Sequence, residues 1–345
     1  MLIFLPIIVT FIIYQVRFNY SGGDLSRLGK ISVPEDYRDK LLSEYDGINT
    51  YYFEWTENLE EYEFDVLVLG DSFSQQNELG YQNFLAMNSS VKVLNISNSY
   101  FDTSNSLINL YELINSDFFD DYHFDYILIQ SVERAINLRT IEFTEYAGST
   151  QILDDKNDYQ DIVSYSSSEL LKDPLDLVMK ELNDATMYSL YNLAYTFDNN
   201  AYISPVYKFK LKDSNFSYNE NLLVYEDDVN NLKYKNDNGL TSQTNQALNF
   251  LQEYLDSLDI DLIFLPAPDK LTIYQEDIAT FKYDNSYFYE DLSLLEKKYI
   301  YIDSYKLLYE AIKNNVLDVY YYDDTHWSPI GAKIIADKLI QIIEN

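Results

Sequence analysis

The feature that most limits the fold of this chain is a regular alternation of short apolar runs with helical stretches. Apolar runs lie at Asp65–Gly70, Val91–Ser97 and Tyr126–Gln130, with helical periodicity around 77–87 and 104–115. Short apolar runs that end in turns are typical of strands buried on both faces. Strands and helices in alternation predict a parallel sheet with right-handed crossovers.

The pattern returns near the carboxyl terminus after a long irregular stretch. An amphipathic helix at Thr241–Leu258 precedes a strand at Asp261–Leu265, and a fifth strand is expected at Tyr299–Asp303. The last helix is expected to begin at Pro329, with Ser328 as its N-cap. These elements predict an α/β fold with a doubly wound, flavodoxin-like sheet of five parallel strands. In that layout ligands bind at the carboxyl ends of the strands.

We divide the chain into an N-terminal segment at 1–18, a linker and lead-in at 19–60, and an α/β domain at 61–345. Residues 140–240 are interpreted as an insertion between strands 3 and 4, either a lid or substrate-binding elaboration or surface filler. The uncharged run before Arg17 is just short of the 17 to 25 residues of a spanning helix. It predicts a single-pass membrane anchor, with a signal peptide or a buried helix as the alternatives.

Two observations bear on the location of this chain. No small-residue cleavage site follows the apolar run, which disfavours a signal peptide. The basic residues after the run would keep the body inside the cell, but long domains translocate largely regardless of charge. We therefore expect a protein of the cell membrane whose body lies outside the cytoplasm.

Composition excludes several classes of function. The chain has 24 Lys and Arg against 57 Asp and Glu, a net charge of −33, which argues against nucleic-acid binding. It has no cysteine, so disulfides, thiol catalysis and cysteine metal sites are excluded. No cofactor is expected. Only His123 and His326 can supply an imidazole, and His123 lies in an Asp-rich loop typical of the surface.

A serine follows the first strand at the position where a nucleophile would stand. Gly70, Asp71 and Ser72 place the Ser72 hydroxyl just beyond the carboxyl edge of the predicted sheet. Its own backbone N–H, near a helix start, could stabilise a developing oxyanion. The alternative is that Asp71 and Ser72 only cap the following helix.

A second polar group precedes the last helix, at 323–329. Residues two apart in an extended segment share a face, so Asp324 can orient the imidazole of His326, with Asp323 as the competing candidate. The topology brings His326 to the edge that carries Ser72. This predicts Ser72 as nucleophile, His326 as base and Asp324 as orienter. The alternatives are a packed histidine, or a metal site with both aspartates and His326 as ligands.

These residues resemble a known group of proteins. GDSFS at 70–74 and DTHWSPIGA at 324–332 are similar to motifs of the SGNH hydrolase superfamily, specifically its alginate O-acetyltransferase (AlgJ/AlgX-type) SGNH-hydrolase-like family. Gln130–Arg134 and Pro266–Tyr274 also look similar, so that the resemblance covers roughly 65–135 and 261–338. It implies that the Asp-x-His-Trp motif supplies acid and base, and that a membrane acyltransferase partner delivers the acetyl donor.

The chain departs from that family in three respects. In the alginate enzymes the Asp-x-His motif precedes the serine, whereas here Ser72 comes first, as in ordinary SGNH esterases. This order puts the polymer in doubt more than the chemistry. The oxyanion glycine has no counterpart near Asn95–Tyr100, where Asn98 or Ser99 could substitute, and Glu133 and Arg134 replace the Gly-x-Asn-Asp block. A hole that rests on the Ser72 N–H would be weaker, since one donor is worth about 2.7 to 4 kcal/mol.

The remaining candidates are polar residues that follow the predicted strands. We group Asp71, Asn98, Ser99, Glu133, Arg134, Lys270 and Tyr274 as candidates for oxyanion or substrate binding. Glu133 and Arg134 either position substrate or form an internal ion pair, whereas Lys270 and Tyr274 either contact sugar hydroxyls or are solvated. The negative surface favours a neutral acceptor.

Three functions are consistent with these features. The leading hypothesis is a membrane-anchored serine acyl-transfer enzyme, an O-acetyltransferase that uses the triad on a cell-surface or exopolysaccharide glycan. The alternatives are an SGNH carbohydrate esterase (deacetylase) with the same triad, and a noncatalytic glycan-binding or assembly protein on the same fold.

Overall fold

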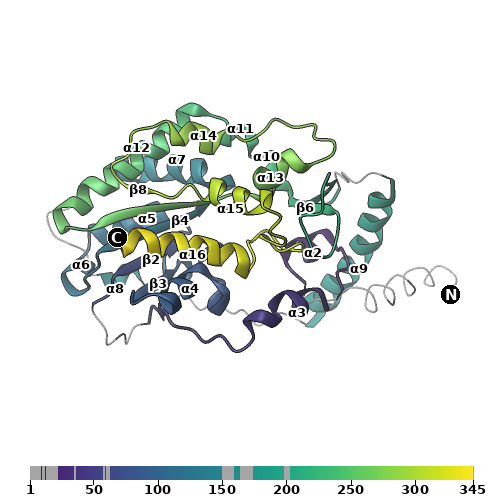
Figure 1. Cartoon of the computed structure of the whole chain (residues 1–345), viewed down its shortest axis with the longest axis horizontal. Coiled ribbons are helices and arrows are strands. Elements are labelled where there is room, and N and C mark those ends of the chain that lie inside the picture. Colours follow the sequence, from purple (N-terminus) through teal and green to yellow (C-terminus); the bar gives the residue numbers. More distant parts are fainter. Residues whose placement is uncertain are drawn as a thin grey trace.

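A six-stranded parallel sheet forms the centre of the computed structural model (Figure 1). The structure describes residues 9, 12, 22–34, 36–56, 59, 63–149, 159–163, 174–197 and 203–344. In order across the sheet, the strands are β1 (Phe53–Glu54), β3 (Val93–Ser97), β2 (Val66–Gly70), β4 (Tyr126–Val132), β7 (Asp261–Ala267) and β8 (Ile300–Tyr301). The predicted parallel α/β architecture is therefore confirmed.

The sheet differs from the expectation in its number of strands. The five predicted strands are present and run in the order 2-1-3-4-5, which is the flavodoxin-like order. The prediction of five strands was wrong, because β1 adds a sixth beside β3. This strand has only two residues, too few for a pattern, and long-range bonds hold it in place. Asn95 donates to the Glu54 carboxylate at 3.1 Å, and the Trp55 N–H donates to the Asn95 carbonyl at 3.0 Å.

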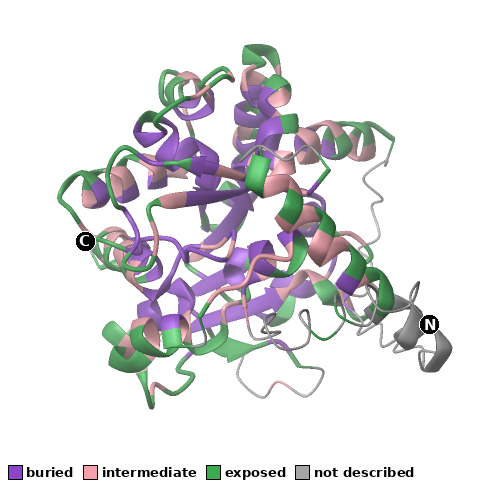
Figure 2. Ribbon diagram, turned by 90° about the vertical axis from the view of Figure 1, so that its right-hand side faces the viewer, coloured by how far each residue is buried: buried purple, intermediate pink, exposed green. Residues whose placement is uncertain are grey.

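Alternate residues of each central strand point into two separate apolar cores. Val66 and Val68 of β2 pack with one cluster, whereas Leu67 and Leu69 pack with the other. The first core is covered by α4 (Tyr81–Asn88), α15 (Ser304–Lys313) and α16 (Pro329–Ile343). The second is covered by α5 (Ser106–Ile114), α7 (Glu133–Ser149) and α12 (Asn238–Leu255). Helices on both faces leave the four central strands largely buried, as Figure 2 shows, whereas β1 is exposed and β8 is half-buried.

Short elements complete the described chain. The helices are α6 (Phe118–Asp121), α8 (Tyr159–Ile162), α13 (Lys270–Tyr274) and α14 (Phe288–Ser293). The 3-10 turns are η1 (Ser43–Tyr45), η2 (Ser72–Ser74), η3 (Asn77–Leu79), η4 (Asn98–Tyr100), η5 (Asp256–Leu258) and η6 (Gln275–Asp277).

The segment expected to be a linker and lead-in is folded onto the body. It contains α2 (Asp24–Gly29), α3 (Asp36–Leu42) and β1. The apolar run at 1–18 lies outside the described residues apart from Val9 and Ile12. Among the residues that are described, no helix has both the length and the apolar character needed to cross a bilayer. The anchor, the division into domains and the location outside the cytoplasm stay predictions.

The stretch between β4 and β7 has elements of its own. They are α9 (Pro174–Phe197), an antiparallel pair of β5 (Val206–Lys210) and β6 (Asn221–Tyr225), α10 (Glu226–Asn230) and α11 (Leu232–Lys235). Side chains of the pair join the first core. The predicted boundaries at 140 and 240 fall inside α7 and α12, so no break in the backbone marks an insertion there.

Candidate active site

The turn after β2 presents Ser72 to solvent. A Cβ at Gly70 would overlap the side chains of Ser74 and Gln130, so only glycine allows this close packing. The Gln130 side-chain oxygen accepts hydrogen bonds from the Asp71 N–H and the Ser74 hydroxyl, both at 3.0 Å. The turn is thus held by the side chain of Gln130 on β4, while Ser72 is exposed at the start of η2.

Asp71 fixes this turn to the end of β4. Its carboxylate accepts the Phe73 N–H at 3.2 Å, the Val132 N–H at 2.7 Å and Arg139 Nη1 at 2.8 Å. Burial opposes the charge, but Arg139 and these hydrogen bonds outweigh it and hold the pKa of Asp71 below its ordinary value. Asp71 is therefore a cap and a structural anchor, whereas the Ser72 hydroxyl remains outside that network.

The loop before α16 is a narrow hairpin that carries His326. Tyr320 bridges to Trp327, and the Tyr321 N–H donates to the His326 carbonyl at 3.2 Å. The imidazole packs on the ring of Phe73, with centroids 4.7 Å apart. As predicted, Ser328 caps α16, and its hydroxyl accepts the Ile330 N–H at 3.1 Å. These contacts fix the position of the ring.

The structure brings Ser72, His326 and Asp324 together. His326 Nε2 lies 2.7 Å from Ser72 Oγ, and Nδ1 lies 2.6 Å from Asp324 Oδ1. Burial lowers the pKa of His326, but the hydrogen bond and charge of Asp324 outweigh it and raise the pKa above its ordinary value. Burial would raise the pKa of Asp324, yet His326 and Arg38 hold it well below its usual range. This arrangement is that of a nucleophile, a base and an orienting carboxylate.

Asp323, the competing candidate, faces away from the imidazole. Its carboxylate accepts Arg38 Nη2 at 3.0 Å and the Gly23 N–H at 2.7 Å. It is therefore absent from the alternative metal group. Asp24 instead lies with Asp324 and His326, their ligand atoms within 4.8 Å of one another.

Asp24 and Arg38 are the residues near the triad that the sequence did not reveal. Arg38 Nη2 donates to Asp324 Oδ2 at 2.9 Å. The Thr325 N–H and hydroxyl donate to the two oxygens of Asp24, at 2.8 and 2.6 Å. These partners lie almost the full length of the chain apart, so no local pattern could indicate them.

The predicted oxyanion donors lie at the correct edge but are only partly free. Among the described residues, the Ser72 N–H makes no hydrogen bond. Gly70 pairs with Ser97, so η4 follows the neighbouring strand end. The Asn98 amide donates to the Ser104 carbonyl at 3.2 Å, and the Ser99 N–H donates to Ser97 Oγ at 3.3 Å. The Ser72 N–H is thus the donor that is ready to bind an oxyanion.

Glu133 and Arg134 belong to a buried ionic group. Arg134 pairs with Asp269 at 2.9 Å and Asp228 at 3.2 Å, and Lys235 pairs with Asp269 at 2.9 Å. Glu133 accepts the Asp269 N–H at 3.0 Å. Burial raises the pKa of Asp228 to about 8. The two predicted candidates are therefore joined through Asp269 inside the protein.

Lys270 and Tyr274 are also internal. Lys270 Nζ donates to the carbonyls of Tyr321 and Tyr322, at 2.8 and 2.9 Å, and so supports the loop that carries His326. Burial lowers the pKa of Lys270 to about 8. Tyr274 is fully buried, with its ring against Tyr320 and Phe216. Neither side chain is solvated.

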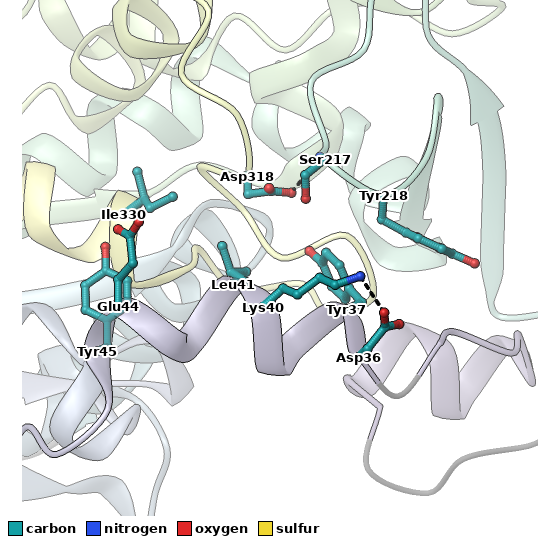
Figure 3. Close-up of a pocket in the computed structure, with 10 residues that line it drawn as sticks. All are labelled: Asp36, Tyr37, Lys40, Leu41, Glu44, Tyr45, Ser217, Tyr218, Asp318 and Ile330. Atoms are coloured by element: carbon teal, nitrogen blue, oxygen red, sulfur yellow. Dashed lines mark hydrogen bonds and ion pairs between the residues drawn. The ribbon is translucent and has the colours of Figure 1, made fainter.

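A hollow of about 390 Å³ lies beside α3 (Figure 3). It is lined by Asp36, Tyr37, Lys40, Leu41, Glu44, Tyr45, Ser217, Tyr218, Asp318 and Ile330. The hollow adjoins the loop that carries His326, because the Tyr37 hydroxyl accepts the Tyr322 N–H at 2.8 Å. The Tyr218 ring also packs on Tyr322, with centroids 5.0 Å apart.

A comparison with known proteins identifies the carboxyl-terminal part of the chain. Residues 225–345 match the family model described as "SGNH hydrolase-like domain, acetyltransferase AlgX". No curated protein and no solved structure matches the chain. The matched part contains Asp324 and His326, whereas Ser72 lies outside it. The resemblance drawn from the sequence is confirmed, and the match supports acyl-transfer or hydrolase chemistry.

Proposed function

We propose that this chain, whose residues 225–345 match the SGNH hydrolase-like AlgX family model, is a serine O-acetyltransferase acting on a glycan. The observation that carries this function is the continuous relay from Ser72 through His326 to Asp324, with contacts of 2.7 and 2.6 Å. Such a relay activates a serine for covalent acyl transfer.

The residues have defined roles in two half-reactions. Ser72 Oγ attacks the acetyl carbonyl while His326 Nε2 takes the hydroxyl proton, and His326 then protonates the leaving group. Asp324 stabilises the imidazolium that forms. The Ser72 N–H is the donor proposed to face the oxyanion. In the second half, His326 Nε2 takes the proton of a sugar hydroxyl, whose oxygen attacks the carbonyl of acetyl-Ser72. The bond from Ser72 Oγ to the acetyl carbon then breaks, and His326 returns the proton to Oγ, which yields the acetylated sugar and the free serine.

The surface favours a neutral glycan as the acceptor. A net charge of −33 repels an anionic polymer. The hollow beside α3 offers tyrosine rings for stacking, among them Tyr218, and carboxylates such as Glu44 that accept hydrogen bonds from sugar hydroxyls. We place the acceptor subsite there.

The proposal includes a membrane anchor, which would be the apolar run at 1–18. A protein anchored by that run would receive its acetyl group from a membrane acyltransferase partner, as the family resemblance implies. Its body would then work on glycan outside the cytoplasm.

An acetylesterase is the second candidate, and one observation favours it. Ser72 is exposed, so water can approach the acyl-enzyme as readily as a sugar hydroxyl can. The same three residues would then hydrolyse an acetylated glycan.

Intact-mass measurement on the full chain after exposure to p-nitrophenyl acetate tests the shared first step. We expect one added acetyl group that is absent from Ser72→Ala. Adding a neutral oligosaccharide to the acetylated protein then separates the two candidates, since acetylated sugar indicates a transferase and free acetate an esterase. Failure of the folded wild-type protein to take up acetyl would favour a noncatalytic glycan-binding protein.

A further inference from the structure

The N-terminal segment at 22–38 packs directly against the loop that carries His326. The Ser26 N–H donates to the Asp323 carbonyl at 3.1 Å, and the Gly23 N–H donates to the Asp323 carboxylate at 2.7 Å. A Cβ at Gly23 would overlap this loop and the Arg38 guanidinium. The close fit shows that this segment and the loop form one packed unit.

Arg38 joins the two carboxylates of that loop. Its guanidinium contacts Asp323 through Nε and Nη2, and Nη2 also donates to Asp324 Oδ2 at 2.9 Å. The Arg38 guanidinium lies 4.4 Å above the Tyr321 ring. Asp323 and Asp324 are consecutive and largely buried, so without a cation they would repel each other. A planar fork suits this bridge better than the point charge of a lysine.

Asp24 holds the same loop from the opposite end of the segment. Thr325, which stands between Asp324 and His326, donates both its N–H and its hydroxyl to Asp24. Asp24 lies beside Asp324, with ligand atoms within 4.8 Å, and burial and the charge of Asp324 raise the pKa of Asp24. Asp24 is therefore placed to hold Thr325, the residue between Asp324 and His326.

We propose that Arg38 and Asp24 are positioning residues for the acyl transfer proposed above, on which this role rests. Arg38 holds Asp324 Oδ2, and Asp24 holds Thr325, so that Asp324 Oδ1 stays on His326 Nδ1. Neither residue touches the acyl group. Asp24 and Arg38 thus act on the triad only through the loop that carries His326.

Turnover of p-nitrophenyl acetate by the full chain provides the first test. A misplacement of about 1 Å can cost about 100-fold in rate. We expect Arg38→Met and Asp24→Ala to lower kcat about 10- to 100-fold with little change in KM. Asp24→Asn keeps the size of the side chain and an oxygen acceptor for Thr325, so it should recover most of the rate.

Arg27→Met is the matched control, because Arg27 lies on the same segment and is exposed. It should leave kcat unchanged. Arg38→Lys serves if Arg38→Met does not fold, and should show a smaller loss because one ammonium replaces the fork. Wild-type kcat in folded Asp24→Ala and in a folded Arg38 variant would overturn the role, as would an equal loss in Asp24→Asn and Asp24→Ala.

The second test does not depend on acyl transfer. The Nδ1–H resonance of His326 reports its hydrogen bond to Asp324, and His123→Gln assigns it, since the chain has two histidines. We expect Asp24→Ala and Arg38→Met to shift or broaden this resonance, and Asp24→Asn and Arg27→Met to leave it in place. An unmoved resonance in the first pair overturns the positioning role. If Ser72 is never acetylated but the resonance moves, the acyl-transfer function fails while the positioning role stands.

Discussion

Two clusters of charge lie on the carboxyl side of the sheet, and they differ in how they end. The catalytic cluster (Asp24, Arg38, Asp323, Asp324 and His326) ends at the exposed hydroxyl of Ser72. The interior cluster (Glu133, Arg134, Asp228, Lys235 and Asp269) is joined by ion pairs and has no exposed member. Both contain buried carboxylates with shifted pKa values.

The comparison of the two clusters indicates which feature distinguishes the candidate active site from a buried ionic network. Charged groups in low dielectric shift their pKa values wherever they are buried, including in purely structural networks. A serine hydroxyl that is both exposed and bonded to an imidazole is found in the catalytic cluster alone among the described residues. The ion pairs of the interior cluster join α7, α10, α11 and the start of α13.

The largest expected effect separates the clusters by chemistry. Ser72→Ala should lower esterase or transfer activity by about 10³- to 10⁶-fold, because the nucleophile is lost. Its melting temperature should equal that of wild type, since Ser72 is exposed. Retention of a substantial share of the rate in the folded variant would exclude Ser72 as nucleophile.

A second substitution pair tests the assignment of the two adjacent aspartates. Asp324→Asn should cost about 10⁴-fold in kcat, because an amide favours the wrong tautomer of His326. Asp323→Asn should cost no more than about 10-fold, since the Asp323 carboxylate bonds to Arg38 and Gly23 and acts on His326 only indirectly. Steady-state kinetics on both variants checks the order, and equal losses would reopen the assignment of the orienting carboxylate.

Breaking the interior cluster should change stability instead of rate. Lys235→Met leaves Glu133 buried without its cation and Asp269 with Arg134 alone, which should cost about 3 to 5 kcal/mol of unfolding free energy. Urea unfolding measures this, with the exposed Lys233→Met as control. Turnover per folded molecule should be unchanged. A selective loss of kcat would assign the interior cluster to the reaction.

The pH dependence of the two clusters should also differ. His326 must be neutral to act as base, and its pKa is raised, so kcat/KM should rise with pH through a value above the ordinary 6.5 of histidine. Because the pKa of Asp228 is raised to about 8, the stabilisation that Asp228 contributes to the free energy of unfolding is full below about pH 4. It is lost as pH rises toward 8. In Asp228→Asn, this loss should be absent from the free energy of unfolding, measured with urea between about pH 5 and 8.

The smallest effect concerns the hollow beside α3. Tyr218→Ala should raise KM for a neutral oligosaccharide acceptor about 3- to 10-fold with kcat unchanged, because one stacking ring is lost. Tyr51→Ala is a matched control, since Tyr51 is 53% exposed and does not line the hollow. An equal KM in the two variants would exclude the hollow beside α3 as the acceptor subsite.

The sequence predicted what short-range patterns encode. The apolar runs of β2, β3, β4 and β7 are local, and so are the turn with Ser72 and the cap at Ser328. Asp24 and Arg38 were missed because their partners are almost 300 residues away, in the loop that carries His326. Lys270 was expected at the surface or in a binding site, because lysine is rarely buried unless paired, and only the fold supplies its two carbonyl acceptors.

The attachment of Gly23 to Asp323 also has a consequence for the distance between the Ser72 hydroxyl and the proposed membrane anchor. An anchor that ends at residue 18, as proposed, leaves four residues, 19–22, before Gly23, and the five steps from residue 18 to Gly23 can span no more than about 18 Å. The loop that carries His326 would then lie close to the bilayer surface. Such an enzyme would modify polymer close to the membrane, as the polymer leaves it.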